Sequence, residues 1–402
     1  MSISLNQGEV QRVNECAVCG SRQLESAIDL PRLPLTALYS PQPPAEPATC
    51  YNQGLLVCTT CGHAQVSYQV APSLLYGSEY GFRTSSSGTA RRGTDFFVSA
   101  LDQFAGSRRF KCALDWGCND LYLVKRLENR ADIRIGIDPI WKDREHEKDE
   151  SNIQVIGATI ESIDFPGALS VRPDLIVCRH TLEHIASPRS ILQKLFEFAA
   201  DDALFVFETP GFDALVRRYR FDQVFHQHLQ YFNLTTFQRL IIEIGAEYLG
   251  FRENYHDWGA LLVAFRKCGK QLDGQEMAAA PFGLSEIRER YCVFRQQLSI
   301  FNEVLQSFAG TTIYGYGAAQ MLPVLAYHMG NDLASLMAIL DDDPSRDGWY
   351  YRNLIPPIRY SGTITDLQMA TVLVTAVDNI QPILSKLLAH RPRHILIPFN
   401  LF

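Results

Sequence analysis

Four cysteines near the N-terminus form two pairs with the spacing of metal ligands. Cys16 and Cys19 make one Cys-x-x-Cys-Gly knuckle, and Cys58 and Cys61 make a second, with 38 residues between the pairs. Four thiolates complete the tetrahedral shell of a structural zinc ion and leave no position open for water. We therefore predict a Zn²⁺ ion that holds this module folded and takes no part in the chemistry. His63, beside the second knuckle, remains an alternative ligand.

A second set of residues has the spacing of a nucleoside-binding site. Asp115 and Gly117 lie in the segment LDWGCND, which follows an apolar run, and Asp138 ends the next run 21 residues after Gly117. The glycine allows the backbone close to a ligand, and the second aspartate can accept hydrogen bonds from two ribose hydroxyls. A single glycine favours S-adenosylmethionine over a dinucleotide, and the alternative is an ordinary turn with a buried aspartate. The predicted cofactor contacts are Asp115, Gly117, Asn119, Asp138, Thr159 and His180.

The elements that must position these residues follow from the hydrophobic pattern. Short apolar runs alternate with helix-like stretches from about residue 95 to 267 and again after 311, which predicts mostly parallel α/β sheets. Apolar residues three or four apart between Leu284 and Phe308 predict an amphipathic helix. The proline-rich first 70 residues are expected to be loop-like and to bury little apolar surface.

These patterns predict an α/β protein in four parts. A zinc-binding module is expected at residues 1–72 and a Rossmann-like S-adenosylmethionine-binding domain at 73–270. A connecting helix at 271–310 then leads to a smaller Rossmann-like α/β domain at 311–402.

Charge and hydropathy exclude some partners. Lys and Arg number 37 against 44 Asp and Glu, so the net charge of −7 argues against a nucleic-acid partner. The first twenty residues carry no apolar signal-peptide core, and no apolar run approaches membrane-spanning length. We therefore expect a cytoplasmic protein with no membrane partner.

Taken in order, the motifs resemble those of the zinc-containing sugar C-methyltransferases, which modify nucleotide-linked 4-keto deoxysugars for antibiotics and surface polysaccharides. The resemblance spans nearly the full length. It rests on the CxxCG pairs around IDLPRLPLTALY, on EYGFRTSSSG, DWGCND, HTLEHI and FDQVFHQHLQYFN, and on the late GYGA turn. It implies an S-adenosylmethionine cofactor, a nucleotide-sugar substrate and a C-terminal domain that helps to bind that substrate.

The resemblance also assigns catalytic residues. His228 matches a family histidine proposed to remove the proton next to the ketone, a task that suits an imidazole near neutral pH. His184 and Tyr80 match positions near the sugar and could donate to the resulting oxyanion. His226 and Gln227 belong to the same block. Each residue also has a structural alternative, in which it packs or caps a turn.

The catalytic block departs from the family pattern. The usual Tyr-His-Glu-His has Phe225 and Gln227 at its first and third positions here, so a phenol and a carboxylate are lost. The expected His-Gly-Gly stretch is Asp257-Trp258-Gly259, and the lysine common after the GYGA turn is replaced. Two alternatives to methyl transfer therefore stay open: pyranose-to-furanose ring contraction without net methyl transfer, and a non-catalytic binding protein.

The C-terminal unit carries a second candidate ligand site. A short apolar run ends in a glycine turn before a helix, and the amide groups of that helix could face a pyrophosphate. An acidic cluster at the next strand end is better suited to sugar hydroxyls. The predicted substrate contacts are Gly315, Tyr316, Gly317 and Asp341.

Overall fold

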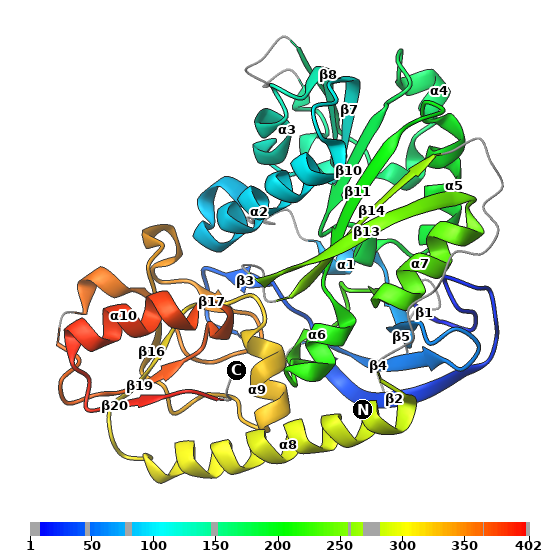
Figure 1. The fold of residues 1–402 in the computed structure, drawn as a ribbon. Coiled ribbons are helices and arrows are strands. Elements are labelled where there is room, and N and C mark those ends of the chain that lie inside the picture. The colour runs from blue at the N-terminus through cyan, green and yellow to red at the C-terminus, as the bar shows by residue number, and fades with distance from the viewer. Residues whose placement is uncertain are drawn as a thin grey trace.

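The computed structural model describes residues 9–44, 49–76, 83–145, 152–255, 259–267, 282–364 and 366–398. Figure 1 shows three larger sheets that follow one another along the chain, one for each predicted module. Tyr80, Asp257 and Trp258 lie outside the described residues. Within the described part of the chain, no helix is long and apolar enough to cross a membrane.

The central domain is built on a seven-stranded sheet with the order β13-β14-β11-β10-β7-β8-β9, in which only β14 runs antiparallel to its neighbours. Its strands are β7 (Phe110–Trp116), β8 (Ala131–Ile137), β9 (Ile153–Ile156), β10 (Leu175–Arg179), β11 (Leu204–Thr209), β13 (Ala246–Asn254) and β14 (Ala260–Lys267). Its helices are α2 (Gly88–Ala105), α3 (Tyr122–Arg126), α4 (Phe165–Ala168), α5 (Pro188–Phe198), α6 (Phe212–Arg217) and α7 (Leu234–Glu243). This confirms the Rossmann-like α/β prediction.

The central strands are apolar throughout because helices cover both faces of the sheet. In β10, Leu175 and Val177 belong to one buried cluster, which also contains residues of α2. Ile176 and Cys178 belong to a second cluster, which contains residues of α5 and α7. The two layers leave the carboxyl ends of β7, β8 and β10 at one edge, where open α/β sheets bind their ligands.

The N-terminal module is a sheet, and the expectation of a loop-like segment is wrong. Strands β2 (Leu24–Pro34), β4 (Cys50–Cys58) and β5 (Ala64–Val66) pair antiparallel, and the order β12-β5-β4-β2 includes β12 (Gln230–Tyr231) from the central domain. Two shorter pairs flank this sheet: β1 (Val10–Arg12) with β6 (Tyr68–Val70), and β3 (Tyr39–Ser40) with β17 (Tyr350–Tyr351). Helix α1 (Pro72–Leu75) follows.

The apolar residues of this module are buried because other modules cover them. Leu30, Leu33 and Leu55 are fully buried in a cluster that also contains residues from α6, α8 and the C-terminal domain. The strand face that the module cannot bury alone therefore becomes part of a core shared by three modules.

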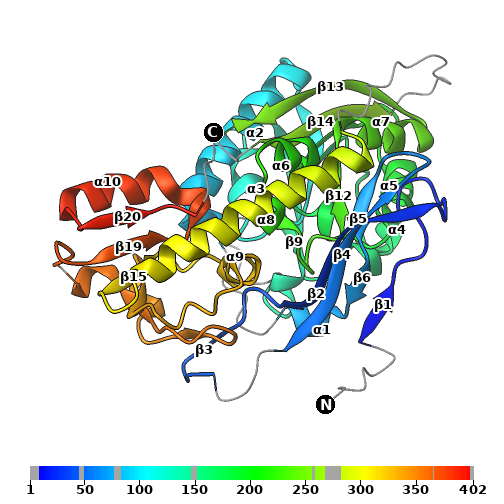
Figure 2. The same cartoon turned by 90° about the horizontal axis from the view of Figure 1, so that it is seen from below.

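The C-terminal domain is a five-stranded parallel sheet with the order β18-β16-β15-β19-β20. Its elements are β15 (Ile313–Tyr316), α9 (Leu322–Met329), β16 (Ala338–Asp341), β18 (Ile358–Tyr360), β19 (Thr371–Val374), α10 (Ile380–His390) and β20 (His394–Leu396). Helix α8 (Leu284–Ser307) confirms the amphipathic connection and packs against β2 and α9, as Figure 2 shows from below. Its buried face carries Ile287, Phe294, Leu298 and Leu305.

Candidate active site and zinc centre

The four predicted zinc ligands come together in the N-terminal module. Cys16 Sγ lies 3.6 Å from Cys61 Sγ, and Cys19 Sγ lies 3.6 Å from Cys58 Sγ. All four sulfur atoms lie within 4.8 Å of one another. A tetrahedral ion with Zn–S bonds of about 2.3 Å separates its thiolates by about 3.8 Å. The cysteine cluster therefore fits a structural Zn²⁺ ion.

Glycine makes both knuckles possible. Gly20 and Gly62 have φ values of +72° and +78°, and their amides donate to the carbonyl oxygens of the first cysteine of each knuckle at 2.9 and 2.7 Å. His63 is fully buried, and its Nε2 lies 2.9 Å from Gln230 Oε1. The imidazole therefore braces the module against β12, and four thiolates complete the metal set without it.

The loop after β7 approaches the loop after β10 so closely that only glycine fits. Gly117 has a φ of +85°, and a Cβ built on it would lie 1.9 Å from Thr181 Oγ1. The same loop is fastened to β8, because the Asn119 amide donates to Asp138 Oδ2 at 3.0 Å. Asp138 Oδ1 accepts a second hydrogen bond from the Ile140 amide at 3.0 Å. The residues predicted from the nucleoside spacing thus meet at one edge of the sheet.

Asp115 is a buried acid at the end of β7. Its side chain is 2 % exposed, and its Oδ1 has no hydrogen-bond partner among the described residues. Burial, together with the charge of Asp138, raises the pKa of Asp115 to about 8, while Arg179 opposes the shift. A buried acceptor without a donor fits the ammonium group at the amino-acid end of S-adenosylmethionine.

Two other predicted cofactor contacts lie on neighbouring loops. Thr159 is exposed in the loop after β9, immediately before the short helix Ile160–Ser162. His180 follows β10 with a φ of +51°, and its Nε2 lies 3.3 Å from Glu208 Oε1. The positions agree with a cofactor lying along this edge, and contact with the cofactor stays a prediction for both residues.

The predicted catalytic histidines face each other. The ring centroids of His184 and His228 lie 5.0 Å apart at an interplanar angle of 68°. His184 Nδ1 donates to the Gln227 carbonyl oxygen at 2.7 Å, so its Nε2 is the nitrogen left for a ligand. A backbone bond of 2.7 Å from the Leu229 amide to the Glu183 carbonyl oxygen holds the two segments side by side.

Burial keeps His228 neutral. Loss of solvent lowers the pKa of His228 well below its ordinary value, and the nearby His184 and His180 lower it further. A neutral imidazole retains a lone pair that can accept a proton, while the lowered pKa makes His228 a weaker base than a free histidine.

Two residues beside the pair were missed by the sequence analysis. The Tyr76 hydroxyl lies 3.3 Å from His184 Nδ1. Glu183 is 1 % exposed, and its Oε1 lies 4.0 Å from His184 Nε2 and 3.6 Å from His180 Nδ1. The His-x-x-Glu-His spacing within HTLEHI was the available signal, since it places the carboxylate between two imidazoles.

Among the described residues, the side chains of Gln227 and His226 make no hydrogen bond or ring contact with His184 or His228. Gln227 Oε1 accepts from Thr36 Oγ1 at 3.2 Å and from Gln320 Nε2 at 2.9 Å, and its Nε2 donates to the Leu75 carbonyl at 3.0 Å. His226 is 1 % exposed and packs edge-on near Tyr51. The Gln227 amide is therefore bonded within the fold, whereas neither ring nitrogen of His226 has a hydrogen-bond partner among the described residues, and a catalytic role stays a prediction for both.

The backbone amides of residues 317–319 are bonded within the fold, and contact of the following helix's amides with a pyrophosphate stays a prediction. The Gly317 amide donates to the Leu340 carbonyl, the Ala318 amide to Asp341 Oδ2 at 2.7 Å, and the Ala319 amide to the Gly317 carbonyl. Gly315 lies inside β15, where a Cβ would contact the neighbouring strands.

The other predicted substrate contacts also have partners in the fold. The Tyr316 hydroxyl donates to Asp342 Oδ1 at 2.9 Å, and Asp341 Oδ1 accepts from the Asp343 amide at 3.0 Å. Substrate contact stays a prediction for Gly315, Tyr316, Gly317 and Asp341. The turn does lie beside the histidine segment, because Gln320 bonds to Gln227.

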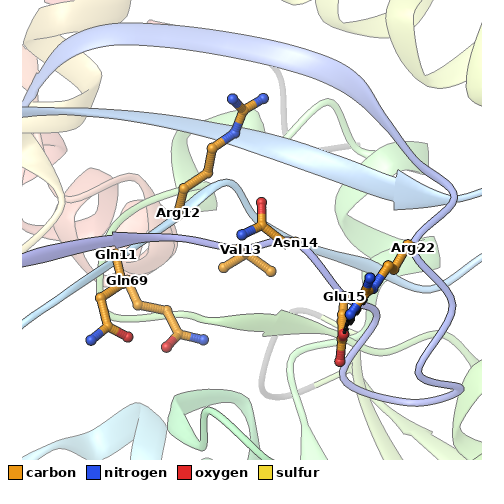
Figure 3. A pocket seen from close by; sticks show the side chains of 7 residues that line it. All are labelled: Gln11, Arg12, Val13, Asn14, Glu15, Arg22 and Gln69. Atoms are coloured by element: carbon orange, nitrogen blue, oxygen red, sulfur yellow. Dashed lines mark hydrogen bonds and ion pairs between the residues drawn. The ribbon is translucent and has the colours of Figure 1, made fainter.

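A separate depression of about 610 Å³ lies on the zinc module, as Figure 3 shows. Its charged groups include Arg22 and Glu15, which form an ion pair at 2.8 Å, so they largely neutralise each other. The depression is lined from β1, β6 and the first knuckle rather than from the carboxyl ends of the central sheet, and it contains none of the predicted site residues.

Two models of known protein families match parts of the chain. Residues 16–76 match a family model described as "Putative zinc binding domain", and residues 90–249 match one described as "Methyltransferase domain". The chain is similar to the C-methyltransferase NovU of Streptomyces niveus, with 22% identity over 231 residues. That match covers 57% of this chain and 54% of NovU, so the chain spans about half the length of this curated relative.

Solved structures are similar to part of the chain. The N-methyltransferase NodS of Bradyrhizobium japonicum, in complex with S-adenosyl-L-homocysteine, has 17% identity and a TM-score of 0.36, covering 48% of this chain and 93% of NodS. The plantazolicin methyltransferase BpumL has 15% identity and a TM-score of 0.37, covering 48% of this chain and 91% of BpumL.

By similarity, the chain therefore carries a zinc-binding domain followed by a methyltransferase domain, and the four-cysteine cluster fits the first of them. More narrowly, the chain is similar to a C-methyltransferase, NovU, over part of the length of each protein.

Proposed function

We propose that this enzyme transfers a methyl group from S-adenosylmethionine to a carbon next to the ketone of a nucleotide-linked deoxysugar. The observation that carries the proposal is the pair of facing imidazoles, His184 and His228, at the edge of the sheet that also holds Gly117 and Asp138. A carbon atom becomes nucleophilic only after it loses a proton, so a C-methyltransferase needs a base at this place.

His228 is the proposed base. Its burial favours the neutral ring, and the proton next to the ketone would move to its free nitrogen. The enolate carbon would then form the new C–C bond as the methyl–sulfur bond breaks, with S-adenosylhomocysteine as the leaving group. S-adenosylmethionine supplies the electrophilic methyl, and the chain positions the two carbons in line.

The proposed substrate lies between the central and C-terminal domains. The bond between Gln320 and Gln227 joins the glycine turn of the C-terminal domain to the histidine block. A sugar held beside His228 would therefore extend toward the C-terminal sheet, which leaves that domain to bind the nucleotide. NovU, a relative by sequence, is itself a C-methyltransferase.

The test is to incubate the enzyme with S-adenosylmethionine and a panel of nucleotide-linked 4-keto deoxysugars and to weigh the products. A product heavier by one methylene, with release of S-adenosylhomocysteine, supports the proposal. An isomer of unchanged mass with intact cofactor would refute methyl transfer and leave ring contraction, the alternative opened by Phe225 and Gln227 in place of the family's tyrosine and glutamate.

Exchange in deuterated water isolates the base. The wild type should incorporate deuterium next to the ketone when S-adenosylhomocysteine replaces the methyl donor, and His228→Asn should slow this exchange by about 10²-fold or more. The exposed His390 on α10 provides a matched control, and His390→Asn should exchange at the wild-type rate. Wild-type exchange in His228→Asn would refute the assignment.

A further inference from the structure

Glu183 is a buried carboxylate to which no side chain or amide of the described residues donates a hydrogen bond. Its side chain is 1 % exposed, and neither Oε1 nor Oε2 has a hydrogen-bond partner among the described residues. A buried carboxylate left without partners costs several kcal/mol, so such groups are normally paired or bound to a cation. The basic groups that face it are His180 Nδ1 at 3.6 Å and His184 Nε2 at 4.0 Å from Oε1.

The surrounding ligand atoms converge on one point. A carboxylate oxygen of Glu183 and one ring nitrogen each of His184 and His228 lie within 4.8 Å of one another. Because His184 Nδ1 donates to the Gln227 carbonyl oxygen, the lone pair of Nε2 is directed to the side of Glu183. Histidines that bind metals usually donate their second nitrogen to a carbonyl or carboxylate in this way.

The backbone holds the ligands in place. Glu183 and His184 belong to the short helix Leu182–His184 directly after β10. His228 comes from the segment before β12, and the bond from the Leu229 amide to the Glu183 carbonyl, at 2.7 Å, ties the two segments together. The short helix contacts β12, and β12 pairs with β5 of the zinc module. Backbone hydrogen bonds therefore hold the two ligand-bearing segments side by side.

We propose that Glu183, His184 and His228 bind a divalent transition-metal cation, distinct from the structural zinc. Two imidazoles and one carboxylate suit Zn²⁺, Mn²⁺ or Fe²⁺ and leave coordination positions open for an added oxygen ligand. Ligands bonded to one such cation lie about 3 to 3.5 Å apart, so small side-chain rotations close the observed separations.

The binding site itself does not depend on the reaction. Its consequence for catalysis rests on the proposed function, because a cation bound there would inhibit a reaction that uses His228 as a free base. When His228 is a ligand, its lone pair cannot accept a proton, so cation binding and the role of His228 as a free base exclude each other.

The experiment adds Mn²⁺ to the full-length, zinc-loaded enzyme without substrate and follows the free-ion signal by electron paramagnetic resonance. We expect one bound Mn²⁺ whose spin-echo spectrum shows coupling to imidazole ¹⁴N. Glu183→Gln should weaken this binding by about tenfold or more. Glu197→Gln, which changes an exposed glutamate on α5 of the same domain, should bind Mn²⁺ as the wild type does.

Absence of bound Mn²⁺ in the wild type, or equal affinity in Glu183→Gln, would overturn the proposal. If Glu183→Gln does not fold, the wild-type spectrum decides: ¹⁴N coupling supports the site, and its absence overturns it. The product-mass assay reports only on the proposed function, so failure of methyl transfer with intact ¹⁴N-coupled binding would refute that function and leave the cation site standing.

Discussion

Replacement of Gly117 by alanine should show whether the loop after β7 binds the cofactor, independently of the stability of the rest of the fold. The substitution has two costs. Alanine at a φ of +85° costs about 1–2 kcal/mol of backbone strain. The new Cβ would also lie 1.9 Å from Oγ1, 2.8 Å from Cβ and 2.9 Å from Cγ2 of Thr181. Because all three side-chain atoms are too close, no rotamer of Thr181 relieves the overlap.

The chain offers a matched control. Gly310 has the same φ of +85°, but a Cβ there would meet nothing within 4 Å. Gly310→Ala therefore carries the backbone strain without the collision. The difference in cofactor affinity between the two variants therefore reports the collision alone. To restore ordinary contact, the loop after β7 must move about 1 Å away from the loop after β10. A shift of that size can lower the rate of a reaction at a positioned site by about 10²-fold.

Isothermal titration with S-adenosylmethionine and S-adenosylhomocysteine, together with urea unfolding, tests the reasoning. We expect Gly310→Ala to lose about 1 kcal/mol of unfolding free energy and to keep its affinity for the cofactor. Gly117→Ala should lose more stability and bind the cofactor at least about tenfold more weakly. Wild-type cofactor affinity in Gly117→Ala would show that this loop does not bind the cofactor.

Three other predictions follow from buried groups. Burial lowers the pKa of His226 to about 4 and of His328 to about 3, so the unfolded chain takes up protons first as the pH falls below about 6.5. Each of these two histidines should therefore lower the free energy of unfolding by about 2 kcal/mol by pH 5. In urea titrations of His328→Leu, the free energy of unfolding should depend correspondingly less on pH. Gln227→Glu places a carboxylate against a backbone carbonyl, so it should cost about 2 kcal/mol or more in urea unfolding and should not raise activity. Cys58→Ser should lose zinc, measured by atomic emission, and unfold at lower temperature, whereas Cys50→Ser, outside the cluster, should retain zinc.

The central sheet was predictable because its strands are buried on both faces and therefore apolar at successive positions. The same reasoning missed β9, which has only four residues, and β13, whose residues are mostly only partly buried. The strands of the zinc module were missed for another reason. Strand β2 contains Pro31, whose missing amide is tolerated because the pairing with β4 shifts register between Leu30 and Leu33.

The site was predictable where one motif carries the chemistry. The two CxxCG knuckles, Gly117 and Asp138 each follow from local spacing, and the structure brings the members of each set together. The structural role of Gln227 was not predictable, because its partners Thr36 and Gln320 lie 191 and 93 residues away along the chain. A resemblance in sequence order names a residue, but only the packing of modules shows whether its polar atoms are already used.

The zinc centre is coupled to the histidine pair through the sheet that the two share. The second knuckle leads into β5, β5 pairs with β12, and β12 begins two residues after His228. His63 strengthens this link by bonding to Gln230 of β12 at 2.9 Å. The loop that contains Gly117 has no strand in that sheet. Loss of zinc should therefore disturb the segment that carries His228 before it disturbs the cofactor loop, which makes the metal a support for catalysis although it lies outside the chemistry.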